Sequence, residues 1–377
     1  MSEVTQYILL VAFLAVALSV AMSFIFRWIR TIGTYAYAGA RIGAMKGELF
    51  RGERLNHLIR SEGVDSVMSV LQSSPYSKQL SRVEKATPPE FEMAFRSHQV
   101  EVQAEISAMV PDDMREVLDE MSKIVDVQNL KTLLICKEAN VRTEEAMSMV
   151  SPGGRMGAML ERIYSASNVP ELVGRLEGTE YWPALSGALD EFERRKSLLP
   201  LLHALDRHYY ERLWRKILAT RAKYIEVVKN FIGLRADVQN IKLILRCKRD
   251  NLPPEDILRY VLPIRLDLSQ ERIRKMAEAR DVVEAILMLE GTDYGKVLSD
   301  AIPSYAETKS TYVFEKALDD FVLKRSRSIA VKYYVGIGPV IGFLMEKEAE
   351  VRNLTAVVNG KAEGEGAEEI EKYILRG

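Results

Sequence analysis

The fold is decided by the stretch Asp126-Val127-Gln128-Asn129-Leu130-Lys131, which recurs 111 residues later as Asp237-Val238-Gln239-Asn240-Ile241-Lys242. Both copies are followed, at a similar distance, by a cysteine and a lysine: Cys136-Lys137 and Cys247-Lys248. A weaker third copy is Glu350-Val351-Arg352-Asn353-Leu354. A chain built from copies of one segment is typical of a scaffold, in which function depends on overall shape.

Other landmarks repeat in the same register. Leu176-Glu177-Gly178-Thr179-Glu180-Tyr181 recurs as Leu289-Glu290-Gly291-Thr292-Asp293-Tyr294, and Ala204-Leu205-Asp206 recurs as Ala317-Leu318-Asp319, each 113 residues later. Ser74-Pro75-Tyr76 is a more divergent first copy of the Thr179-Glu180-Tyr181 segment, and Tyr76 lies 105 residues before Tyr181. The period is longer than the roughly 20–50 residues of solenoid repeats, so each unit is expected to be a small domain.

These registers predict three helical repeat units, and they leave an N-terminal segment at residues 1–33. The units cover residues 34–125, 126–236 and 237–377, with approximate boundaries and with terminal helices that the units can exchange. Gene triplication without a shared task is the alternative interpretation of the copies.

The N-terminal segment contains an apolar run. Residues 7–26 (YILLVAFLAVALSVAMSFIF) carry no charge, and a helix of this length matches a bilayer's hydrocarbon core of about 30 Å. Arg27, Trp28 and Arg30 follow it, and positive residues favour the cytoplasmic side. We therefore expect a transmembrane anchor in the cell membrane, with the bulk of the chain on the cytoplasmic face.

Other interpretations of this run are open. A cleaved signal peptide would need positive charge before the run and a small-residue cleavage site after it. A buried core helix of this length would usually show a polar stripe. Translation could also begin at Met22, which would remove most of the segment.

Composition limits the partners. The formal net charge of the 377-residue chain is −1, which argues against nucleic-acid binding, because that binding depends on neutralising phosphates. The chain has two cysteines, Cys136 and Cys247, at corresponding places in different units. We expect them to be free, buried side chains in a reducing compartment.

Nearly all of the chain after the apolar run has helical periodicity, which predicts an all-α protein. Apolar residues from 198 to 231 indicate one long helix with a break near Gly233, and the two Asp-Val-Gln-Asn copies resemble helix starts. Asn129 and Asn240 should be buried and should join neighbouring helices. Residues 359–366 should form a mobile surface loop, and Gly336 and Gly338 a kink or a close helix contact.

No constellation of catalytic residues stands out. The sequence lacks a GxxxxGK[ST] phosphate-binding loop. The four histidines, His57, His98, His203 and His208, lack zinc-site spacing. We therefore predict no catalytic, cofactor-binding or metal-binding residues, no cofactor and no small-molecule substrate.

The run Thr34-Tyr35-Ala36-Tyr37-Ala38-Gly39-Ala40-Arg41-Ile42-Gly43-Ala44-Met45-Lys46, together with the repeated Glu-Gly-Thr-x-Tyr and Asn-Leu/Ile segments, resembles the C subunit of archaeal A-type ATP synthases, which is related to the d subunit of V-type ATPases. This resemblance implies three similar helical domains in a funnel with pseudo-threefold symmetry. It also implies a non-catalytic central-rotor subunit that couples the membrane proteolipid ring to the central-stalk subunits during ion-gradient-driven ATP synthesis.

The N-terminal segment departs from this family, whose members are usually peripheral. An alternative function is therefore a membrane-anchored helical scaffold or assembly factor outside any ATP synthase, and a further one is an enzyme with an unfamiliar helical active site. The sequence leaves open the coupling ion, the ring stoichiometry, and whether the N-terminal helix would lie inside or beside the ring.

Overall fold

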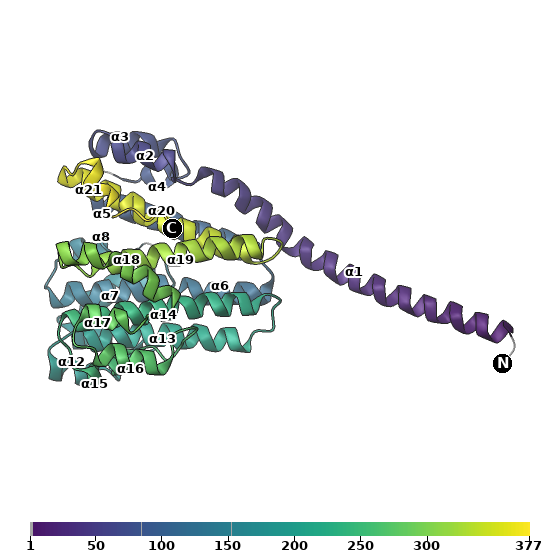
Figure 1. Ribbon diagram of the computed structural model, residues 1–377. Coiled ribbons are helices and arrows are strands. Elements are labelled where there is room, and N and C mark those ends of the chain that lie inside the picture. Colours follow the sequence, from purple (N-terminus) through teal and green to yellow (C-terminus); the bar gives the residue numbers. More distant parts are fainter. Residues whose placement is uncertain (1–2, 84, 152) are drawn as a thin grey trace.

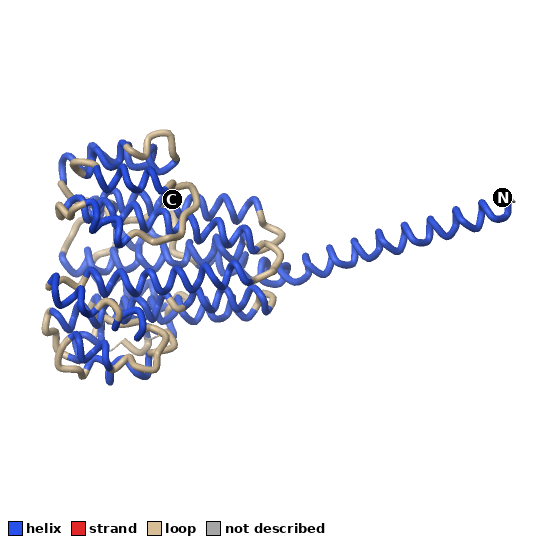
Figure 2. Tube along the Cα trace, turned by 90° about the horizontal axis from the view of Figure 1, so that it is seen from below, coloured by secondary structure: helices blue, strands red, loops and turns tan. Residues whose placement is uncertain are grey.

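The computed structural model describes residues 3–83, 85–151 and 153–377, and these residues form helices and no strands. Figure 1 shows a body of packed helices from which α1 (Glu3–Glu48) projects as a long rod. In Figure 2 most long helices of the body run along one direction, with the connecting loops gathered at its two ends. The predicted all-α class is confirmed for the described part of the chain.

The helices of the body follow one another through short connections. The first group is α2 (Glu53–Arg60), α3 (Gly63–Gln72), α4 (Ser77–Leu80), α5 (Pro88–Ala108), α6 (Asp112–Ser122), α7 (Ile124–Glu138) and α8 (Thr143–Ser148). The second group is η1 (Gly157–Met159), α9 (Leu160–Tyr164), α10 (Val169–Gly174), α11 (Trp182–Ser186), α12 (Leu189–Arg195), α13 (Leu199–Ala219) and α14 (Ile225–Arg249). The third group is α15 (Pro254–Tyr260), α16 (Gln270–Glu278), α17 (Val282–Leu287), α18 (Asp293–Thr308), α19 (Tyr312–Lys332), α20 (Gly338–Glu363) and α21 (Ala367–Glu371).

Corresponding helices begin in the same way. The side chain of Asn168 accepts the backbone N–H of Glu171 at the start of α10, and Asp281, 113 residues later, accepts that of Glu284 at the start of α17. Each glutamate in turn accepts the N–H of the residue before the cap. This pair of bonds is a variant of the capping box, in which the glutamate accepts the N–H of the residue before the cap and not that of the cap itself.

Three helices that carry the repeated motif, α7, α14 and α20, also end in the same way; we call them the inner helices. The residue after each last turn has a left-handed backbone, and the next N–H bonds back to a carbonyl near the helix end, as in a Schellman motif. The left-handed residues are Asn140, Asn251 and Gly364, and the accepting carbonyls belong to Cys136, Cys247 and Gly360. Both cysteines are buried and neither forms a disulfide, as predicted.

Each inner helix carries a buried acid that accepts a hydrogen bond from a tyrosine hydroxyl, and we call these contacts acid–tyrosine links. The α7 link joins Asp126 and Tyr181, the α14 link joins Asp237 and Tyr294, and the α20 link joins Glu350 and Tyr76, with O···O distances of 3.4, 3.0 and 2.8 Å. The tyrosine follows the acid in the first two links. In the third it lies 274 residues before it, so an N-terminal residue completes a contact of the C-terminal helix.

Apolar packing agrees with this last link. Leu55, Leu58 and Phe91 from the N-terminal helices share one buried cluster with Leu354 and Val357 of α20. Figure 1 shows α2, α3 and α4 lying beside α20 and α21, although they are at opposite ends of the chain. The division of the chain into units 34–125, 126–236 and 237–377 stays a prediction.

The second half of α1 is fixed to the body. Tyr35, Ala38, Ile42 and Met45 are buried at alternating spacings of three and four residues, which makes one apolar stripe. The Tyr35 ring meets Tyr224 edge to face, with centroids 5.7 Å apart. The stripe therefore attaches the rod to the body at the α13–α14 turn.

The transmembrane helix predicted at residues 7–26 is not supported. Among the described residues, no helix is both long and apolar enough to cross a membrane. The side chains of residues 7–11, which belong to that prediction, lie outside the described set.

Three local predictions were wrong. The helix expected over residues 198–231 is two helices, because Thr220 after α13 is extended and Tyr224 before α14 has a left-handed backbone (φ 72°). Asp237 lies in the middle of α14 and does not start a helix. Residues 359–363 continue α20, and the turn expected there is confined to residues 364–366.

The predicted close contact at Gly336 and Gly338 is confirmed. A Cβ atom at Gly336 would lie 2.5 Å from the Tyr224 ring, and one at Gly338 would lie 2.7 Å from the carbonyl oxygen of Ile329. Gly233, expected to break a helix, instead lies inside α14 and allows Leu266 to approach.

Candidate functional site

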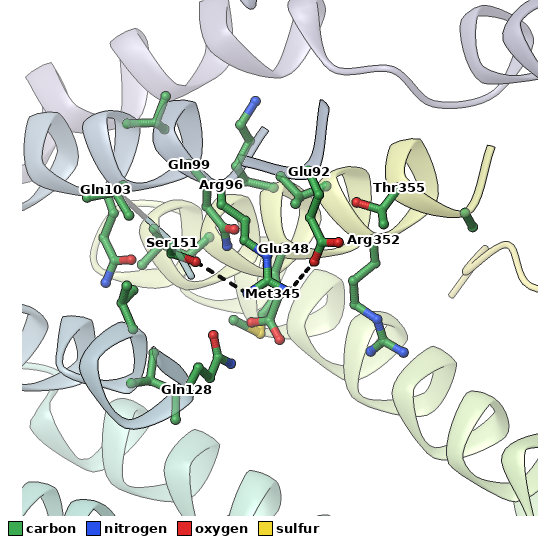
Figure 3. Close-up of a pocket in the computed structure, with 18 of the residues that line it drawn as sticks. Glu92, Arg96, Gln99, Gln103, Gln128, Ser151, Met345, Glu348, Arg352 and Thr355 are labelled. Atoms are coloured by element: carbon green, nitrogen blue, oxygen red, sulfur yellow. Dashed lines mark hydrogen bonds and ion pairs between the residues drawn. The ribbon is translucent and has the colours of Figure 1, made fainter. Parts of the chain in front are cut away.

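A large hollow lies between α5 and the inner helices. It has a volume of about 700 Å³, and Figure 3 shows its polar side chains coming from α5, α7 and α20. Its lining mixes apolar and polar side chains. They include Val100, Ile124, Ile232, Leu344, Met345, Gln99, Gln103, Gln128, Thr355 and Asn359.

A narrower hollow of about 240 Å³ continues it between the inner helices. The two share six lining residues: Ile124, Gln128, Arg235, Met345, Glu348 and Arg352. We therefore treat them as one central cavity. Its walls are rigid helices, which position side chains more reproducibly than loops do.

The repeated motif explains how each inner helix faces this cavity. Because successive residues of a helix point about 100° apart, the four residues of Asp-Val-Gln-Asn point in different directions. In α14, Asp237 and Asn240 are buried against other backbone segments and Val238 packs into the core. Gln239 is left facing the cavity.

The motif asparagines have a uniform structural function. Each amide accepts a backbone N–H and donates to the carbonyl of the same residue, which lies 22 positions further along the chain. The three pairs are Asn129 with Ser151, Asn240 with Leu262 and Asn353 with Leu375. The asparagines are buried as predicted, but their partners are loop residues and not neighbouring helices, because an extended segment exposes its N–H and C=O groups for pairing.

Two corresponding ion pairs lie along the narrow part of the cavity. Lys131 on α7 meets Asp206 at 2.5 Å, and Lys242 on α14 meets Asp319 at 2.5 Å. Asp319 has a second cationic partner, Arg352 on α20, at 2.7 Å. These contacts tie the inner helices to α13 and α19.

The two aspartates differ in pKa direction because they differ in partners. Burial raises the pKa of Asp206, and its single lysine does not fully offset this. Burial acts in the same direction on Asp319, but Lys242 and Arg352 together outweigh it and hold the pKa of Asp319 below its usual value. Asp319 is therefore the more firmly ionised of the two.

The wide part of the cavity also has paired charges. Arg235 on α14 donates to Glu348 on α20 at 2.9 and 3.3 Å, and contacts the sulfur of Met345. On α5, Arg96 donates to Ser151 at 3.3 Å and pairs with Glu92, as Figure 3 shows. Most charged side chains around the cavity are thus already paired with oppositely charged side chains of the same chain.

The cavity has the character of a recognition surface. Among the described residues, no group of three or more His, Cys, Asp or Glu side chains is placed to hold a metal ion. His203 and His208 both lie on α13 and stack on tyrosines of the body, and burial lowers the pKa of each. Neutral polar groups between apolar walls can hold a polypeptide segment through hydrogen bonds and apolar contact.

Comparison with known proteins identifies the family. The model of the ATP synthase (C/AC39) subunit family matches residues 38–373, which is most of the chain. The chain belongs to this family. The resemblance to the C subunit that the sequence suggested is therefore confirmed, and the matched residues include α5 and all three inner helices.

Individual relatives within the ATP synthase (C/AC39) family agree. The chain is 33% identical over 347 residues to the A-type ATP synthase C subunit of Methanocaldococcus jannaschii, covering 91% of this chain and 87% of that one. It is 34% identical over 342 residues to the C subunit of the Methanothermobacter thermautotrophicus A-type ATP synthase, covering 90% and 87%. The corresponding C subunit of Pyrococcus abyssi is 26% identical over 341 residues, covering 90% of each chain.

Sequence reasoning missed the acid–tyrosine links and the cavity-facing glutamines of this ATP synthase (C/AC39) family member. One signal was present. Asp126 and Tyr181 are 55 residues apart and Asp237 and Tyr294 are 57 apart, so a repeated acid and a repeated tyrosine keep nearly the same separation. Tyr76 is the remaining copy of that tyrosine.

Proposed function

We propose that the chain is a non-catalytic central-rotor subunit of an A-type ATP synthase, which couples a membrane proteolipid ring to the central stalk on the cytoplasmic face. The observation that carries this proposal is the central cavity, whose walls are inner helices with corresponding residues at corresponding positions. The three acid–tyrosine links support an arrangement of three similar domains around a common axis, the funnel expected of this family.

The cavity suits the end of a helical stalk. An α-helix with its side chains is about 10–12 Å across, and the cavity lies between α5 and the inner helices. Internal ion pairs such as Arg235 with Glu348 hold the walls together. A rotor subunit must pass torque without deforming, and close-packed helices provide the stiffness.

The ring would contact the end of the body from which α1 departs. The α13–α14 and α19–α20 turns meet there, because the Tyr224 ring lies against Gly336. Leu218, Val331 and Tyr334 are 60%, 80% and 72% exposed at these turns. Exposed large apolar side chains on turns are typical of interaction surfaces.

Binding to the stalk tests the proposal. The full chain would be mixed with the purified coiled-coil stalk subunit of the same ATP synthase and examined by size-exclusion chromatography with light scattering. A one-to-one complex is expected. Two separate species over the whole concentration range would contradict the proposed function and would favour the scaffold or assembly-factor alternative.

Cross-linking tests the ring-facing end. Both native cysteines are buried, so a cysteine introduced by Val331→Cys would be the reactive one. It is expected to cross-link to proteolipid subunits in the assembled complex. Glu144→Cys on α8, an exposed position at the opposite end of the body in Figure 1, is the control and should not react with the ring.

A further inference from the structure

One residue of the repeated motif has no structural partner. The aspartate holds a tyrosine and a backbone turn, the valine packs in the core and the asparagine pairs with a loop. The side chains of Gln128 and Gln239 form no hydrogen bond with any residue that the structure describes, yet both line the central cavity. A residue repeated at corresponding places without a partner of its own is available for a partner from outside.

The position of these glutamines is shared among the inner helices. Gln128 on α7 and Gln239 on α14 correspond to Arg352 on α20, which is already paired with Asp319. Figure 3 shows Gln128 directed into the cavity opposite Gln99 and Gln103 of α5. The two α5 side chains also form no hydrogen bond within the described structure, so amide groups face the cavity from two sides.

Most of the charged side chains near these glutamines already have partners. Lys131, Lys242 and Arg235 all have carboxylate partners within 3 Å. Removing one partner of a buried pair is unfavourable, because an uncompensated charge remains. Glu363 and Glu365, at the outer end of α20, line the cavity without such a pair among the described residues. Glu363 is exposed and Glu365 is half-exposed, so salt screens their charges.

We infer that Gln128 and Gln239 select a stalk helix end that presents uncharged polar groups, namely hydroxyls, amides or free backbone carbonyls. An amide both donates and accepts hydrogen bonds, so it can pair with each of these groups and discriminates against an apolar surface, which would leave it unsatisfied. The inference rests on the proposed function. It predicts that the affinity for the stalk subunit depends only weakly on ionic strength.

The test is a binding titration of the full chain with the purified coiled-coil stalk subunit at about 0.05 and 0.5 M salt. The Q128A/Q239A double variant is expected to bind at least about tenfold more weakly, as the loss of two hydrogen bonds implies. Its thermal unfolding midpoint should match that of the parent chain. Gln72→Ala, at the exposed end of α3, is the matched control and should bind as the parent does.

The outcomes separate the two proposals. Failure of the parent chain to bind the stalk subunit contradicts the proposed function itself. Equal affinity of the parent and the double variant, or a weakened variant whose unfolding midpoint also falls, overturns the inference about the glutamines. A parent affinity that changes more than about tenfold between the two salt concentrations overturns the inference that uncharged groups are recognised.

Discussion

The α14 link and the α20 link occupy corresponding places but stabilise their carboxylates differently. Asp237 accepts three backbone N–H groups, from Leu266, Asp267 and Leu268, besides the Tyr294 hydroxyl. Glu350 accepts a single backbone N–H, from Phe50 at 2.7 Å, besides the Tyr76 hydroxyl. Its remaining partner is a cation, Lys347, at 2.6 Å.

The difference follows from how the chain reaches each site. Around α14 the polypeptide is continuous, so the loop after α15 can curl its backbone around the acid. Around α20 the partners come from the N-terminal region, some 300 residues away for Phe50. The longer glutamate and a buried lysine replace the backbone donors that this arrangement lacks, at the cost of burying two charges.

The substitution expected to have the largest effect on stability is Glu350→Ala, in the α20 link. It leaves Lys347 buried without an acid, and the free energy of unfolding should fall by about 3–5 kcal/mol. Urea denaturation measures the change. In the control, Lys347→Met added to Glu350→Ala should recover most of the loss, since no buried charge remains; a double variant as unstable as the single one would contradict this account.

Asp237→Ala should lower the free energy of unfolding by less than Glu350→Ala does, by about 2–3 kcal/mol, although it removes more hydrogen bonds. No buried cation is left behind, and Leu266 and Asp267 are exposed enough for water to replace part of the lost contacts. The same denaturation assay compares the two variants. A loss larger than that of Glu350→Ala would show that backbone donors matter more than the buried lysine.

Acidification distinguishes the two links. His98 stacks on Tyr76 with ring centroids 4.5 Å apart, whereas Tyr294 stacks on Phe321. Burial and the nearby Lys347 lower the pKa of His98 to about 4. Between pH 6.5 and 4 the unfolded chain therefore binds a proton that the folded chain does not, so stability falls as the pH is lowered through this range.

For His98 the expected loss is on the order of 1–2 kcal/mol, because one pKa unit corresponds to about 1.4 kcal/mol and partial exposure reduces the effect. Unfolding midpoints measured across this pH range check it. His98→Phe, which copies the α14 arrangement, should make the profile less steep, and the remaining slope is expected from His203 and His208, whose pKa values burial also lowers. An unchanged profile would mean that other groups titrate there.

Tyr294→Phe should have the smallest effect. It should lower the free energy of unfolding by about 1 kcal/mol, because it removes one hydrogen bond. Tyr76→Phe should cost more, because its hydroxyl bonds both Glu350 and Lys347. Thermal unfolding of the two variants gives the ranking. Equal losses would show that the lysine contributes nothing through the Tyr76 hydroxyl.

The sequence predicted helices, repeats and family because these depend on local pattern. Asn129 and Asn240 were correctly placed in the interior, since an amide in an apolar face requires a buried partner. Tyr224 could not be foreseen as a helix end, because it packs against Tyr35, which is far away in the chain. The cavity was equally out of reach, because its walls meet only in three dimensions.

The pairing of Phe50 with Glu350 has a consequence for biosynthesis. Helices α2 to α5 leave the ribosome well before α20 does, and Phe50, just before α2, precedes Glu350 by 300 residues. At roughly 5–20 residues per second this interval lasts on the order of 15–60 s. During it the apolar faces of these helices lack their final partner, so the nascent chain has to be shielded from aggregation until its last long helix emerges.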